Sequence, residues 1–121
     1  MCLLLFRKEF VPLICEGKKT QTRRLHPPRF KIGKVYPCRT QIRKESTFAL
    51  AKITGIRPQR LSEISDEEAK AEGMDSRERF LEKFREIYKL SPTENPLVWV
   101  VEFEAQPAEP YMTSRAKSPT L

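Results

Sequence analysis

The positions of apolar and polar residues along the chain predict several β-strands. The strongest strand pattern lies at residues 97–105, LVWVVEFEA, where β-branched and aromatic residues predominate and Glu102 and Glu104 alternate with apolar neighbours. Residues 48–56, FALAKITGI, alternate in part and predict a second strand. Three shorter stretches also have an extended pattern: residues 2–6, 20–25 and 35–36.

A helical block interrupts these strands. Ser65 followed by Glu68 matches a capping box, which predicts a short helix that begins after Ser65 and ends at Gly73. Residues 75–78 repeat the start signal and predict a second helix that ends near Leu90. Its apolar residues recur at helical spacing and are expected to face the core: Phe80, Leu81, Phe84, Ile87 and Tyr88.

The order of these elements predicts an α+β fold. A further helical segment is expected over residues 10–14, before Gly17, whose lack of a side chain suits a left-handed helix end. Strands on both sides of a helical insert favour a small β-barrel. Residues 1–105 are expected to form one domain, and the proline-rich residues 106–121 to form a disordered tail.

The ends and the cysteines of the chain exclude several classes of protein. The opening MCLLLF is too short for a secretory signal, and no segment approaches the roughly 20 apolar residues of a membrane span. We expect a cytoplasmic protein that does not contact a membrane. Cys2, Cys15 and Cys38 are widely spaced and His26 is the only histidine. Because a zinc site needs about four ligands, usually in paired spacing, we expect no metal and no cofactor.

Charge is distributed unevenly along the sequence. Residues 18–44 hold ten Lys or Arg and no Asp or Glu, and residues 1–61 have a net charge of +12 against −5 for residues 62–121. Apolar residues interleave with the basic ones, which predicts a folded basic face rather than a floppy tail. Such a face attracts RNA, DNA or a nucleotide through its phosphates. The alternative is that the two halves pair their charges in salt bridges.

Within the basic window, residues 17–24, GKKTQTRR, carry the candidate chemistry. In an extended segment, alternation places Thr20, Thr22 and Arg24 on one face and Gln21 and Arg23 on the other. Two hydroxyls and a guanidinium in a row can hold a phosphate, a carboxylate or the polar edge of a base. The alternative is an edge strand with solubilising charges.

Aromatic residues offer further candidates for base stacking. Tyr36 lies inside the basic window and is the better candidate, although a contact within the barrel explains it equally well. Trp99 is interpreted as a core residue because it stands in the middle of an apolar strand. The expected binding residues are Lys18, Lys19, Thr20, Thr22, Arg23, Arg24 and Tyr36.

Four segments together resemble the ASCH domain family, which is related to the PUA domains of RNA-modifying proteins. These segments are GKKTQTRRL, the following PPR-K-G-K-V-Y, the acidic SDEEAKAEGM and the closing WVVEFE, and the resemblance covers about residues 5–105. It implies a PUA-like mixed β-barrel with flanking helices and a cleft. It also implies a role in RNA metabolism.

Some small bacterial ASCH proteins are amidohydrolases that remove the acetyl group from N(4)-acetylcytidine. The resemblance assigns the Lys, Thr and Glu of those enzymes to Lys19, Thr22 and Glu72 of this chain. A Thr hydroxyl is a weak nucleophile, and Lys19 can activate it if burial or nearby positive charge lowers the lysine pKa. The chain departs from the bacterial enzymes at Arg23, where they carry an apolar residue.

Two main hypotheses follow, with a weaker third. The first is a binding module that holds RNA or a nucleotide in a basic cleft. The second is an amidohydrolase acting on N(4)-acetylcytidine-type nucleosides, which requires Glu72 to approach Lys19 within reach of a hydrogen bond or one water. The third is a ribonuclease, for which Lys and Thr would have to replace the usual pair of histidines.

Overall fold

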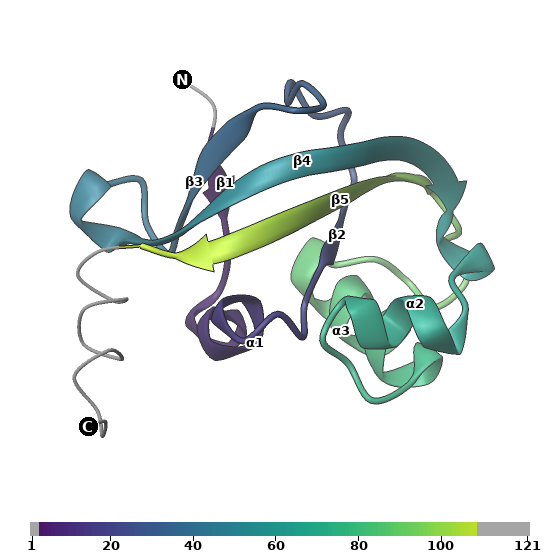
Figure 1. Cartoon of the computed structure of the whole chain (residues 1–121). Helices are drawn as coiled ribbons and strands as arrows, with labels where there is room; N and C mark the ends of the chain where they lie inside the picture. The colour runs from purple at the N-terminus through teal and green to yellow at the C-terminus, as the bar shows by residue number, and fades with distance from the viewer. Residues whose placement is uncertain (1–2, 109–121) are drawn as a thin grey trace.

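A five-stranded mixed sheet organises residues 3–108, the part of the chain that the computed structural model describes (Figure 1). β1 is parallel to β3, and all other neighbouring strands are antiparallel. The sheet curls into a half-barrel, which confirms the predicted α+β fold with a barrel-like sheet. The strands, in their order across the sheet, are β1 (Leu4–Leu5), β3 (Val35–Arg39), β4 (Thr47–Arg60), β5 (Leu97–Pro107) and β2 (Gln21–Arg24).

The long pair β4–β5 forms the centre of the sheet. It pairs from Ala49 opposite Pro107 to Arg60 opposite Leu97, with one register shift between Ile53 and Gly55. β4 and β5 are both longer than the sequence predicts, because strand pairing continues past the alternating residues. The ordered domain therefore extends past residue 105, and residues 109–121 of the predicted tail lie outside the described part.

Three α-helices flank the sheet in Figure 1, with α1 under one end and α2 and α3 together under the other. Their bounds are α1 Val11–Cys15, α2 Asp66–Ala71 and α3 Arg77–Tyr88, and 3-10 turns lie at Lys8–Phe10, Lys44–Ser46 and Leu61–Glu63. The capping box is confirmed, because the Ser65 hydroxyl accepts from the Glu68 amide and the Glu68 carboxylate accepts from the Ser65 amide, each at 3.1 Å. None of the helices within residues 3–108 is long and apolar enough to cross a membrane.

Two clusters of buried side chains form the core. The first packs α1 against β1, β3, β4 and β5, and the second packs α2 and α3 against the start of β5. Met74, in the turn between α2 and α3, contacts both clusters. The fully buried residues with the largest side chains are Leu4, Ile14, Ile53, Leu61, Ile64, Val98, Val100, Val101 and Cys38.

Two details of the sequence interpretation are corrected. The predicted strand at residues 2–6 is only two residues long within the described part, although the Phe6 amide adds one more bond to the Arg39 carbonyl at 2.9 Å. Trp99 is only partly buried and belongs to neither core cluster. The alternation along β5 buries Val98 and Val100 and turns Trp99 to the other face of the sheet.

Candidate functional site

A pocket of about 130 Å³ lies where β2 meets the end of β1, the turn after α2, and α3. Most of its wall is apolar, and its polar and charged groups include Lys19, Thr22, Arg23, Arg24 and Glu72. Four of these five side chains are buried, which is unusual for charged residues unless each is paired. The remaining lining residues are Leu5, Phe6, Arg7, Phe10, Met74, Phe80, Lys83, Phe84, Ile87 and Tyr88.

Lys19 and Glu72 form a buried ion pair inside this pocket. The Lys19 ammonium donates to Oε1 of Glu72 and to the main-chain carbonyl of Glu72, both at 2.8 Å. Glu72 follows the last turn of α2, so the ammonium satisfies a carbonyl left free at the helix C-terminus. The approach of Glu72 to Lys19 that the hydrolase hypothesis requires is therefore present.

Local backbone contacts bring these two residues together. The Thr20 amide donates to the Ala71 carbonyl at 2.7 Å, which attaches the start of β2 to the end of α2. Gly73 then turns the chain with a φ of +92°, a conformation that favours glycine. A Cβ at Gly73 would stand 3.0 Å from a Leu13 methyl and 3.5 Å from the Lys19 Cβ, so glycine also permits the close packing.

Arg23 lies behind this pair and holds the other side of Glu72. Its Nη1 donates to Oε2 of Glu72 and to Oε1 of Gln21, both at 2.9 Å, and its Nε donates to Oε1 of Gln59 at 3.0 Å. Nη2 stands 3.0 Å from Oε2 of Glu68. The residue that departs from the bacterial hydrolases is thus part of an internal network and is not a surface cation.

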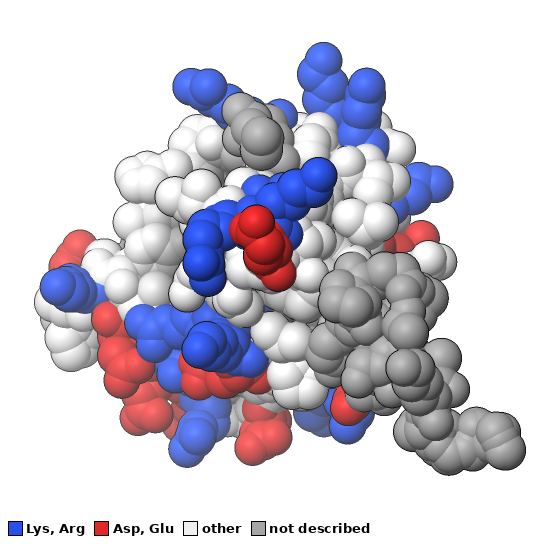
Figure 2. Space-filling model, turned by 90° about the vertical axis from the view of Figure 1, so that its left-hand side faces the viewer, with Lys and Arg blue, Asp and Glu red and all other residues white. Residues whose placement is uncertain are grey.

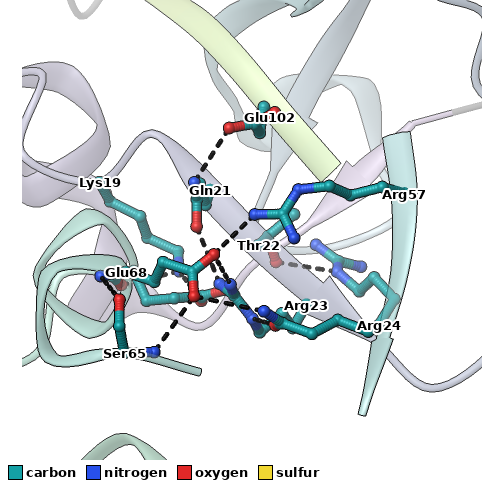
Figure 3. A network of polar contacts seen from close by, with 11 residues as sticks. Lys19, Gln21, Thr22, Arg23, Arg24, Arg57, Ser65, Glu68 and Glu102 are labelled. Atoms are coloured by element: carbon teal, nitrogen blue, oxygen red, sulfur yellow. Dashed lines mark hydrogen bonds and ion pairs between the residues drawn. The ribbon is translucent and has the colours of Figure 1, made fainter. Parts of the chain in front are cut away.

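The network continues from Arg23 to both edges of the site (Figure 3). Glu68 accepts from Arg57 at 2.6 Å and from Gln59 at 3.2 Å. Gln21 donates to Glu102 of β5 at 3.0 Å. Sequence analysis missed this outer set, because its members are separated in the chain and meet only through strand pairing and the packing of α2 against β4.

Thr22 and Arg24 occupy the opposite face of β2. Arg24 Nε donates to the Thr22 hydroxyl at 3.0 Å, while Gln21 and Arg23 bond to each other on the other face, which confirms the predicted alternation. Arg24 also donates to the Leu5 carbonyl at 3.1 Å and lies over the Phe6 ring, 5.1 Å from its centre. This guanidinium therefore links the two edge strands of the half-barrel.

Burial and charge in the site shift the pKa values of Lys19 and Glu68. Burial lowers the pKa of Lys19, against the attraction of Glu72, and the positive charges of Arg24 and Arg23 lower it further. Burial acts to raise the pKa of Glu68, but hydrogen bonds from Arg57, Ser65 and Gln59 and the charge of Arg23 outweigh it and hold the pKa at about 2. Glu68 is therefore a fixed negative charge, whereas burial and the neighbouring arginines favour the neutral form of Lys19.

The structure separates the remaining expected binding residues from the pocket. Lys18 is exposed and pairs with Glu16 at 3.4 Å, and Thr20 is exposed without lining the pocket. Tyr36 packs on Phe30 with ring centres 5.0 Å apart, and its hydroxyl accepts from the Lys31 amide. Only four of the seven expected binding residues therefore line the pocket: Lys19, Thr22, Arg23 and Arg24.

Three of the ten basic residues in the window lie inside the protein and so cannot belong to a basic face. Lys19, Arg23 and Arg39 are buried, and Arg39 is bonded to the Thr47 hydroxyl and the Ile42 carbonyl. On the face that Figure 2 shows, Lys and Arg stand in separate groups, with uncharged surface and acidic side chains between them. Ion pairs between residues 1–61 and residues 62–121, such as those of Lys19 and Arg23 with Glu72, therefore neutralise part of the basic charge.

The apolar wall of the pocket consists largely of residues that the sequence assigned to the core. Phe80, Phe84 and Tyr88 were expected to pack inward from α3, and they line the pocket as well. Phe10 adds a ring face 4.7 Å from the Lys19 ammonium. Within residues 3–108, no three His, Cys, Asp or Glu side chains cluster in a way that could hold a metal ion.

Comparison with known proteins identifies the fold. No protein-family model matches the sequence, and no curated protein matches it. An ASCH domain from Lactobacillus crispatus has a TM-score of 0.66 at 16% identity, over 81% of this chain and 70% of that one. An Enterococcus faecalis protein described by the family DUF984 has a TM-score of 0.68 at 16% identity, over 100% and 85%. An ASCH protein from Zymomonas mobilis has a TM-score of 0.65 at 14% identity, over 97% and 80%.

These likenesses are likenesses of fold, and they agree with the elements observed here. The mixed half-barrel and the flanking helices were both expected from the resemblance. The resemblance noted in the sequence is therefore confirmed at the level of structure, and the chain has the α+β fold of the solved ASCH domains.

Proposed function

We propose that this protein acts in RNA metabolism by holding one base of an RNA or nucleotide in the pocket at β2. The size and lining of that pocket carry the proposal. A space of about 130 Å³ suits a single ring, since a cavity of about 150 Å³ can hold benzene. Apolar walls with a few convergent polar groups are typical of small-molecule sites.

The polar groups on the pocket's β2 side suit the edge of a base. The Thr22 hydroxyl accepts from Arg24, so its own proton can be donated to a carbonyl oxygen of the base. The aromatic wall formed by Phe80, Phe84 and Tyr88 can contact the flat face of a ring. ASCH domains are related to RNA-binding PUA domains, and the shared fold supports the same class of ligand.

A second function, hydrolysis of an N(4)-acyl group on cytidine, is favoured by the Lys19–Glu72 pair beside Thr22 in the same pocket. The Thr22 oxygen would attack the acyl carbonyl while neutral Lys19 accepts the hydroxyl proton. The exocyclic amine would leave with a proton, and water would then cleave the acyl-threonine to give the free acid. Glu72 would hold the lysine in place and stabilise its protonated form.

The experiment is to measure binding of cytidine and N(4)-acetylcytidine, together with release of acetate from the latter. Thr22→Val and Lys19→Met are the test variants, and Lys18→Met is the matched control because Lys18 is exposed and outside the pocket. We expect both test variants to lose turnover and the control to keep it. Binding without turnover in the wild type contradicts the hydrolase alone, whereas failure to bind either nucleoside contradicts the pocket's assignment.

A further inference from the structure

A second groove adjoins the pocket and shares two of its walls. It has a volume of about 250 Å³ and is lined by Arg24, Leu25, His26, Pro28, Phe30 and Tyr88. Arg24 and Tyr88 line both the groove and the pocket, so these two side chains stand between them. The pocket and the groove therefore adjoin across these two side chains.

The lining of this groove suits a stacked, negatively charged molecule. It offers the rings of His26, Phe30 and Tyr88 beside one guanidinium, and none of its lining residues within residues 3–108 is acidic. Aromatic faces and arginine planes are the surfaces on which bases of single-stranded nucleic acids stack. His26 is exposed at the end of β2, where an incoming base can reach it.

The groove rings are supported from behind. Phe30 packs against Tyr36 with ring centres 5.0 Å apart, and Tyr88 packs against Phe84 at 4.5 Å. Phe84 itself lines the pocket. Phe84 and Tyr88 thus form a ring pair that reaches from the pocket to the groove, and Tyr36 braces Phe30 in the same way.

Charge around the groove favours a phosphate backbone. Arg29, Lys31 and Lys34 are exposed on the same connection between β2 and β3, which has no Asp or Glu. The pocket has room for one ring only, so the sugar and phosphate attached to a bound base must lie outside it. This connection also carries the groove residues His26, Pro28 and Phe30, and its cations would attract the phosphates of a strand that follows it.

We propose that the groove at His26 and Phe30 is a subsite for a second nucleotide, so that the protein prefers a short single-stranded oligonucleotide to a single nucleotide or nucleoside. This inference rests on the proposed function, because it takes the pocket as the site of the first base. The connection at residues 25–34 would then determine whether the protein prefers a nucleoside or a strand as its ligand.

The test compares cytidine 5′-monophosphate with tricytidylate as ligands of the full chain by calorimetry, with the deoxyribose trinucleotide as a third ligand. Stacking contributes enough for the trinucleotide to bind about 5- to 150-fold more tightly than the mononucleotide. The sugar that binds better identifies the natural strand as RNA or DNA.

Variants separate stacking from the greater charge of the trinucleotide. His26→Ala and Phe30→Leu should each reduce the ratio of trinucleotide to mononucleotide affinity by several-fold, whereas Lys44→Ala, an exposed cation away from the groove, should not change it. Equal affinities, or a preference that survives both groove variants, would overturn the subsite while the pocket's assignment stands. Failure to bind any of the three ligands would instead overturn the proposed function.

Discussion

Lys19 and Glu72 are separated by 53 positions in the sequence, yet their side chains meet at 2.8 Å in the interior of the protein. Arg23 holds the second oxygen of the same carboxylate at 2.9 Å. One carboxylate thus serves two buried cations, and it holds the lysine in a pocket that Thr22 also lines. An ion pair in the interior is costly to desolvate, so its presence in a pocket is more readily explained by function than by stability.

Glu72→Gln should lower the pKa of Lys19 further. Burial already lowers this pKa, and the negative charge of Glu72 opposes that effect. Removing the charge leaves burial and the neighbouring arginines acting alone. NMR titration of the lysine side chains would detect the shift, and Glu16→Gln, which removes only the exposed partner of Lys18, is the control. A Lys19 pKa that stays unchanged or rises in Glu72→Gln would contradict this account of the site.

Local signals in the sequence predicted most of the secondary structure. The capping box at Ser65, the glycine helix ends and the alternation in β5 depend on residues close together in the chain, and each was found as predicted. The alternation within GKKTQTRR also placed Thr22 and Arg24 on one face of β2. Lys19, Thr22 and Glu72 were predicted to act together only because of the resemblance to the ASCH family.

Charge was the less reliable guide, because a count of basic residues does not show which of them are paired. Arg23 and Arg39 were assigned to a basic face and are instead buried against partners in other elements. Glu68, Arg57 and Gln59 were not predicted as part of the site, since their meeting depends on the register of β4 and on the position of α2. Long-range pairing of this kind leaves no periodic signal in a single sequence.

Acid should remove the stabilising contribution of Glu68. Its pKa is held at about 2 in the folded protein against an ordinary 4.5, so the contribution is complete above about pH 4.5 and is lost as the pH falls toward 2. The shift is equivalent to at most about 3 kcal/mol of unfolding free energy, and solvent screening at this partly exposed carboxylate reduces that contribution. Urea unfolding of the wild type and Glu68→Gln should therefore differ at pH 7 and converge near pH 2.

Glu67→Gln is the control for that experiment, because Glu67 lies in the same first turn of α2 but is exposed. It reports the general effect of removing a carboxylate from a helix N-terminus. A gap between Glu68→Gln and the wild type that is as large at low pH as at pH 7 would show that the contribution of Glu68 does not depend on its charge.

Arg24→Lys should loosen the connection between the edge strands. Lysine cannot reproduce the fork that bonds both the Thr22 hydroxyl and the Leu5 carbonyl. We expect a loss of about 1–3 kcal/mol in the unfolding free energy. Hydrogen exchange should accelerate at the Phe6 amide, which bonds to Arg39 beside β1. Arg43→Lys, at an exposed position, should change neither quantity, and unchanged exchange at Phe6 in Arg24→Lys would show that the guanidinium does not hold β1.

Gly55→Ala should disturb the site from outside the pocket. A Cβ at Gly55 would stand 2.7 Å from Oε1 of Glu102, which is too close for a real contact. The carboxylate must therefore move, and its bond to Gln21 at 3.0 Å is lost, leaving Gln21 less firmly placed beside Arg23. We expect a cost of about 0.5–1.5 kcal/mol in the unfolding free energy, typical of one hydrogen bond.

The effect of Gly55→Ala on the unfolding free energy should change sign when the Glu102 carboxylate is absent. The three atoms nearest to the new methyl group are Oε1, Cδ and Cβ of Glu102. Glu102→Ala removes the first two and leaves only the Cβ, at an ordinary contact distance of 3.7 Å. Replacing glycine by alanine at a compatible position stabilises by about 0.4–1 kcal/mol, because it restricts the unfolded chain. Denaturant unfolding of the four proteins forms a double-mutant cycle that isolates the contact. If Gly55→Ala costs the same in both backgrounds, the strain lies in the register shift of β4 beside Ile53, and Glu102 does not respond to it.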